Sequence, residues 1–101
     1  MKFGLSDTVI KELQDIFRRH ANIEKVLIFG SRSKGNYRPG SDIDLAVIGK
    51  NIDYSLLLEI LCEIDELELL HSIDLLDYQK KVGTPLGDHI DRVGQVFFEA
   101  A

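Results

Sequence analysis

The chain is short of several things that whole classes of protein need. It has 101 residues, one cysteine and two prolines, and no apolar run approaches the roughly 20 residues of a membrane-spanning helix. The lone Cys62 has no partner for an internal disulfide, which is typical of a reducing compartment. No apolar stretch follows Lys2, as it would in a secretory signal. We therefore expect a single cytoplasmic domain over residues 1–101 that has no membrane partner.

Basic residues are scarce as well. Twelve lysines and arginines against 17 aspartates and glutamates give a net charge of −5, so no broad basic surface is available. Nucleic acid is therefore not an expected partner. The apolar share of 45% and the charged share of 29% are ordinary for a globular protein, which excludes extensive disorder.

Hydrophobic periodicity predicts both helices and strands. Helices are expected over residues 6–20, from about 53 to 64 and over 85–93, and strands over 25–29, 43–48, 72–76 and 96–98. The polar, glycine-rich stretch 30–41 predicts a loop with one helical turn. This loop is too short for the crossover helix that a parallel connection needs. We therefore predict an α+β fold, with a mixed central sheet of about four strands and helices packed on one side.

Acidic residues interrupt two of the predicted strands. Asp42 and Asp44 are two residues apart, so their carboxylates project from the same face of a strand, while Ile43 faces the core. Adjacent carboxylates repel, and one takes up a proton unless a cation lies between them. Asp74 lies in the next strand; Asp77 competes with it, but its odd spacing turns it to the opposite face. If the two strands pair, three carboxylates converge in a set that suits Mg²⁺.

The turn after the first strand has the features of a phosphate site. A strand that ends in Gly30 and Ser31 can present backbone N–H groups and a hydroxyl to a phosphate. Arg32 and Lys34 follow closely and add positive charge, although solvated loop charges are an equally simple interpretation. The turn is not a Walker A loop, because the lysine and hydroxyl residue that should follow its second glycine are missing.

The combined pattern resembles the polymerase-β-type nucleotidyltransferases, and their minimal branch (MNT) in particular. The pattern consists of Gly30-Ser31, ten further residues, Asp42-Ile43-Asp44, and then Ile73-Asp74-Leu75 where the family has its third acidic residue. The resemblance implies that Asp42, Asp44 and Asp74 are catalytic and bind two Mg²⁺ ions. It further implies that the phosphates of ATP are bound by Gly30, Ser31, Arg32, Lys34, Arg38 and Ser41.

The minimal branch commonly acts as the antitoxin of a two-gene pair, with a HEPN-domain ribonuclease as the toxin. The resemblance therefore implies transfer of AMP from ATP to a tyrosine hydroxyl of such a toxin, in a hetero-oligomer with this chain. Three alternatives stay open: transfer to a small molecule, transfer to an RNA 3′ end, and inhibition of the partner by binding alone. An exposed apolar patch around Val96 and Phe97 would favour an obligate partner.

Overall fold

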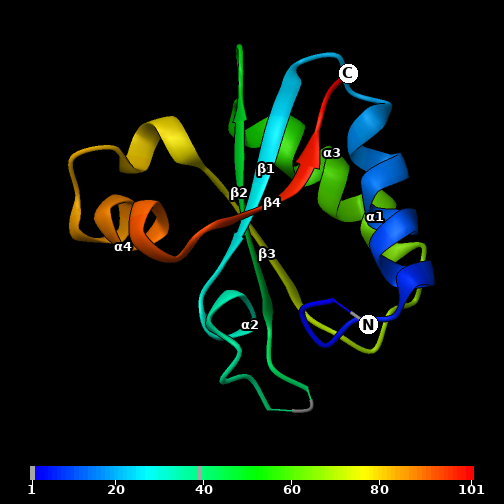
Figure 1. Ribbon diagram of the computed structural model, residues 1–101. Helices are drawn as coiled ribbons and strands as arrows, with labels where there is room; N and C mark the ends of the chain where they lie inside the picture. The colour runs from blue at the N-terminus through cyan, green and yellow to red at the C-terminus, as the bar shows by residue number, and fades with distance from the viewer. Residues whose placement is uncertain (1, 39) are drawn as a thin grey trace.

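The computed structural model describes residues 2–38 and 40–101, so that Pro39 of the predicted loop lies outside the described residues. It shows a four-stranded sheet (Figure 1) made of β1 (Ile23–Phe29), β2 (Ile43–Gly49), β3 (Ile73–Asp77) and β4 (Gln95–Glu99). The strand order is β3-β2-β1-β4, in which β1 is antiparallel to β2 and β4, and β2 is parallel to β3. The predicted α+β fold with a mixed sheet is therefore confirmed.

The helices begin and end close to the predicted positions. They are α1 (Asp7–Arg18), α2 (Ser31–Lys34), α3 (Tyr54–Asp65) and α4 (Pro85–Val93), with the 3-10 helix η1 at Tyr78–Lys81. Ser6 caps α1 by accepting from the Val9 N–H (3.2 Å), and Asp53 caps α3 by accepting from the Leu56 N–H (2.8 Å). The expected helical turn in the loop is α2, whereas η1 was not predicted. Within residues 2–38 and 40–101, no helix has the length and apolar character needed to cross a bilayer.

The long helices α1 and α3 cover one face of the sheet (Figure 1). Their buried side chains, such as Leu13 and Ile60, pack in the main core with every second residue of β2 from Ile43 and with the inward residues of β1. The expected placement of helices on one side holds for these two, but α4 packs on the opposite face, where Ile90 contacts Phe29 and Ala46. Side chains alternate between the two faces of a strand, so Phe29 and Ala46 point away from the main core. The helix α4 buries them on the opposite face.

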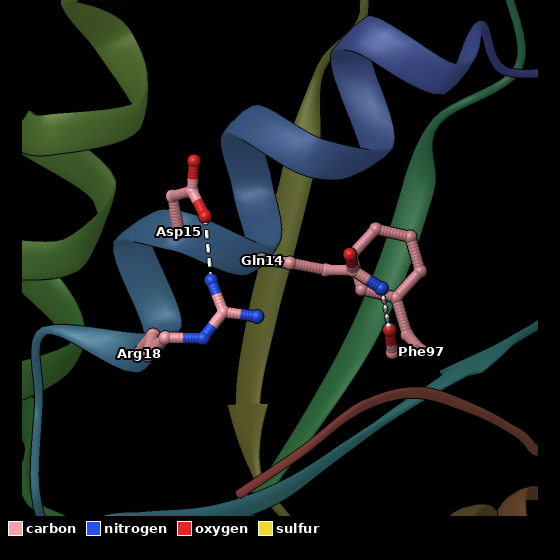
Figure 2. Close-up of polar contacts among 4 residues, drawn as sticks. All are labelled: Gln14, Asp15, Arg18 and Phe97. Carbon is pink, nitrogen blue, oxygen red and sulfur yellow. Dashed lines mark hydrogen bonds and ion pairs between the residues drawn. The ribbon is translucent and has the colours of Figure 1, made fainter.

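The edge strand β4 is held by α1. Figure 2 shows the amide of Gln14 donating to the carbonyl of Phe97 (2.8 Å), next to the ion pair between Asp15 and Arg18 (2.5 Å). Phe97 is buried and Val96 is 48% exposed. The apolar patch that these two residues would have formed is therefore reduced to one side chain.

Candidate active site

The candidate residues gather at one end of the sheet. β1 ends at Phe29, and the register pairs this residue with Asp44 near the start of β2. Because β2 and β3 are parallel, the start of β3 lies at the same end. The turn at Gly30 and Ser31 therefore meets the first residues of two neighbouring strands there.

Two of the carboxylates lie side by side on paired strands. The register of β2 and β3 sets Asp44 opposite Asp74, and Asp42 precedes β2 by one residue. Burial raises the pKa of the Asp44 carboxyl, and the charges of Asp74 and Asp42 and a hydrogen bond with Asp74 raise it further. The predicted pairing of the two strands is thus confirmed, and it brings Asp44 and Asp74 together with Asp42 nearby. Asp77 is buried on the other face, where its carboxylate accepts from the Gln79 N–H (3.1 Å).

This arrangement fits a divalent cation whose remaining ligands come from a substrate. Among the residues that the structure describes, no three histidine, cysteine, aspartate or glutamate side chains are arranged so that they could together hold a metal ion. Mg²⁺ is usually held by one or two carboxylates together with substrate phosphates and water, so an open pair such as Asp44 and Asp74 suits it. Burial is the main cause of the raised pKa of Asp44, and the negative charges of Asp74 and Asp42 add to it; a bound cation would offset those charges. The ligand roles of Asp42, Asp44 and Asp74 stay predictions.

Gly30 allows the Asp44 carboxylate to lie against the turn after β1. Its backbone has φ 77° and ψ −153°, a conformation that residues with a side chain avoid. A Cβ atom at Gly30 would lie 2.6 Å from Oδ2 of Asp44. Glycine is therefore needed here both for its backbone conformation and for the approach of this carboxylate.

Ser31 begins the single turn of α2 next to these acids. The first hydrogen bond of the turn runs from the Lys34 N–H to the Gly30 carbonyl (3.2 Å), so the N–H groups of residues 31–33 precede it. The Ser33 hydroxyl donates to the same carbonyl (2.9 Å), and the side-chain amide of Gln95 on β4 donates to the Ser33 carbonyl (2.6 Å). These bonds hold α2 against the sheet, with its first amides at the end where the carboxylates lie.

Arg32 points into the protein, which does not support its predicted contact with phosphate. The side chain is 3% exposed. Its Nε and Nη2 atoms donate to the Ser41 carbonyl (3.1 and 2.9 Å), and Nη1 donates to the Phe3 carbonyl (2.9 Å). The guanidinium also lies over the ring of Tyr37, with its carbon 5.1 Å from the ring centre. Arg32 therefore braces the loop that leads into Asp42.

His71 completes this brace from the segment that precedes β3. Its Nδ1 atom lies 3.3 Å from Nη2 of Arg32. Burial and the Arg32 charge lower the pKa of His71, which favours the neutral ring as an acceptor for the guanidinium. Sequence reasoning missed the roles of His71 and Phe3. Their partner is 39 and 29 residues away along the chain, and no local spacing signals such contacts.

The other predicted phosphate contacts differ in their surroundings. The Ser41 hydroxyl accepts from the Arg38 N–H (2.8 Å), and the Ser41 N–H donates to the Arg38 carbonyl (2.9 Å). Ser41 thus closes the end of the loop, although it remains partly exposed. Lys34 and Arg38 have exposed side chains on the same loop. Their contact with phosphate stays a prediction.

The sequence itself matches a known family. Residues 11–101 fit the family described as polymerase beta, nucleotidyltransferase. The chain belongs to this family. The resemblance that rested on the glycine–serine turn and the three acidic residues is thereby confirmed. No curated protein matches the chain significantly.

Solved structures of about one-fifth sequence identity share the fold. One is a chain of a toxin–antitoxin complex with AMP-PNP, with 23% identity and a TM-score of 0.69 over 95% of this chain and 75% of the other. Another belongs to a complex of a tri-AMPylated Shewanella oneidensis HEPN toxin with its MNT antitoxin, with 23% identity and a TM-score of 0.59 over 93% and 69%. A putative nucleotidyltransferase from Sulfolobus solfataricus has 21% identity and a TM-score of 0.54 over 95% and 91%.

Proposed function

We propose that this chain is a Mg²⁺-dependent nucleotidyltransferase that moves AMP from ATP to a tyrosine hydroxyl of a HEPN-domain toxin and thereby acts as its antitoxin. The observation that carries the proposal is the pairing of Asp44 with Asp74 against the Gly30 turn. The similar complexes with AMP-PNP and with an AMPylated HEPN toxin support the choice of nucleotide and acceptor.

The residues of the site divide the chemistry among them. Asp42, Asp44 and Asp74 would hold the Mg²⁺ ions, which when bound neutralise the triphosphate and polarise the acceptor hydroxyl. We assign to Asp74, on the outer strand, the role of accepting the proton of that hydroxyl. The acceptor oxygen then bonds to the α-phosphorus of ATP, and the bond to the bridging oxygen of pyrophosphate breaks. The first amides of α2 and the Ser31 hydroxyl stabilise the charge that develops on the pyrophosphate.

Inhibition by binding alone is a second candidate, which an exposed apolar surface on α3 favours. Both candidates are tested by the intact mass of the neighbouring gene's product, which we propose to be the HEPN-domain toxin, after incubation with this chain, Mg²⁺ and ATP. We expect a gain of one or more AMP units. The Asp42→Asn/Asp44→Asn variant should abolish the gain, and Asp7→Asn/Glu24→Gln, which removes two exposed charges elsewhere, should retain it.

One result would contradict adenylylation, and a second would contradict the assignment of the catalytic residues. The first is an unchanged mass together with a tight complex for both the wild type and the Asp42→Asn/Asp44→Asn variant, which would leave a binding module. The second is a gain in mass that persists in that variant, which would place the catalytic residues elsewhere.

A further inference from the structure

The outward face of α3 carries apolar side chains where a surface helix normally carries polar ones. Tyr54 is 70% exposed, Leu58 is 42% exposed and Cys62 is exposed; their spacing of four residues places them in one stripe. On the other side of the helix, Ile60 and Ile64 are buried in the core. A helix that is apolar on both sides is typically covered on both sides.

The stripe continues into a cavity of about 770 Å³ between the end of α3 and the start of β3. Leu61 and Leu69 line this cavity, as does Leu70, which is 97% exposed. Glu68 has a left-handed backbone with φ 53°, so the chain turns sharply just before these leucines. The stripe and the cavity together, called the α3 groove below, comprise Tyr54, Leu58, Leu61, Cys62, Leu69 and Leu70.

The rim of the α3 groove is acidic. Asp65, Glu66 and Glu68 line the cavity, and all three are exposed. The ion pairs found within residues 2–38 and 40–101 involve other acidic residues, so these three carboxylates are not neutralised by a neighbouring cation. An apolar floor with an uncompensated negative rim is complementary to an apolar surface that carries positive charge.

We propose that the α3 groove docks a helix of the acceptor protein, with large apolar side chains on one face and lysine or arginine beside them. A helix laid in such a groove anchors residues at spacings of three, four and seven, and its flanking cations meet the acidic rim. A second copy of this chain does not meet this description. Two copies joined through the groove would bring Asp65, Glu66 and Glu68 of each copy together, in a protein whose net charge is already −5.

One wall of the groove is continuous with the strands that carry the candidate active site. Ser72 belongs to its wall, and the Ser72 carbonyl accepts from the Ile43 N–H (2.8 Å) between Asp42 and Asp44. Two residues further along, Asp74 sits on β3, which forms the outer edge of the sheet. Because Ile73 and Leu75 pack in the main core under α3, Asp74 lies on the opposite face of the sheet. A protein docked in the groove would therefore reach Asp74 around the free edge of β3. In this respect the inference rests on the proposed function, because it assigns the groove to the acceptor of AMP.

The first test measures the affinity for the HEPN-domain protein encoded beside this chain. It is made in the Asp42→Asn/Asp44→Asn background, so that transfer of AMP plays no part. We expect Leu58→Ser/Leu70→Ser to weaken binding at least tenfold, because buried apolar anchors dominate such interfaces. Val82→Ser is the matched control, since Val82 is 55% exposed and lies outside the groove. Asp65→Asn/Glu66→Gln/Glu68→Gln should weaken binding and reduce its dependence on salt.

The second test uses Cys62 as a reporter, because it is the only cysteine of the chain and lies within the groove. A thiol reagent should modify it rapidly in the free protein. Saturation with the HEPN-domain protein should slow the modification at least tenfold. A synthetic helical peptide with leucines at spacings of four and three, flanked by lysines, should compete for the same protection. The same peptide with glutamates in place of the lysines should not.

The outcomes separate this inference from the proposed function. If the groove variants weaken binding but the wild type transfers no AMP, the docking surface stands and the proposed function fails. If AMP is transferred while Leu58→Ser/Leu70→Ser binds as tightly as Val82→Ser, the inference is overturned. It is also overturned if Cys62 stays reactive in the saturated complex, if neither the HEPN-domain protein nor the peptide binds, or if the free chain dimerises and thereby protects Cys62.

Discussion

Replacing Arg32 by methionine should destabilise the protein strongly, because the main role of Arg32 in this structure is to hold the loop and not to bind phosphate. Methionine keeps the apolar stem of the side chain but removes its three hydrogen bonds to the carbonyls of Ser41 and Phe3. A buried carbonyl left without a donor costs about 1–3 kcal/mol. Two such carbonyls, partly rehydrated, should together cost about 2–4 kcal/mol. In a domain of this size 1 kcal/mol lowers the melting temperature by about 4–8 °C, so we expect a fall of at least about 8 °C.

The assay is thermal unfolding followed by circular dichroism, without nucleotide or metal. Lys34→Met is the matched control, because it removes the same charge from the same helical turn at an exposed position. It should change the free energy of unfolding by no more than roughly 0.5 kcal/mol, as surface substitutions usually do. Arg32→Lys should be nearly as unstable as Arg32→Met, since a lysine lacks the planar set of donors that reaches both carbonyls.

Kinetics should show the same division of roles. Because Ser41 directly precedes Asp42, loss of the brace should lower kcat for AMP transfer, whereas Lys34→Met should raise the KM for ATP. The reasoning is refuted if Arg32→Met unfolds within 2 °C or so of the wild type and changes only the KM for ATP. That pattern would make Arg32 the phosphate contact that the sequence first suggested.

Three further predictions follow from the geometry of the site. In EDTA, Asp44→Asn should raise the melting temperature by a few degrees, because like charges opposite each other on paired strands cost about 0.2–1 kcal/mol. The control Asp7→Asn should leave it unchanged. A lower melting temperature for Asp44→Asn would contradict repulsion between Asp44 and Asp74. Gly30→Ala should reduce AMP transfer at least about 100-fold by displacing Asp44, whereas Gly83→Ala, with a similar φ but open space, should keep it. Because the folded-state pKa of His71 lies below its unfolded value, its contribution to stability is lost as the pH falls below about 6.5. His71→Gln should therefore lose less stability in urea titrations between about pH 7 and about pH 5, and equal losses would refute this.

The strand faces on which the acidic residues lie could be predicted from the sequence, because side chains along a strand alternate with a strict period of two. Asp42 and Asp44 had to share a face, and Asp77 had to face away from Asp74 once Ile73 was placed in the core. The structure confirms this division: Asp77 is buried and caps η1, while Asp74 is exposed opposite Asp44. Parity along a strand is local information, and it is enough to assign the faces once the strands are known.

The position of α4 shows where local information ends. Its bounds at Pro85 and Val93 are readable from the sequence, and the structure has them at the expected residues. Periodicity also shows which side of the helix is apolar. It does not show which face of the sheet will receive that side, because this depends on how much of each face α1 and α3 leave uncovered. Phe29 and Ala46 supply the answer only when the register of β1 and β2 is known.

Arg32 and Lys34 show that a local rule can also be overlooked. Both lie in the turn predicted to bind phosphate, yet their spacing could have shown that their side chains point in different directions. Residues two apart on a helix do not face the same side, so one helical turn cannot turn both cations toward one phosphate. One of them had to point toward the protein. A buried cation needs several acceptors at once, and arginine, with five donors in a fixed plane, meets that need better than lysine. The inward position of Arg32 and the outward position of Lys34 thus follow from side-chain chemistry once α2 is recognised as helical.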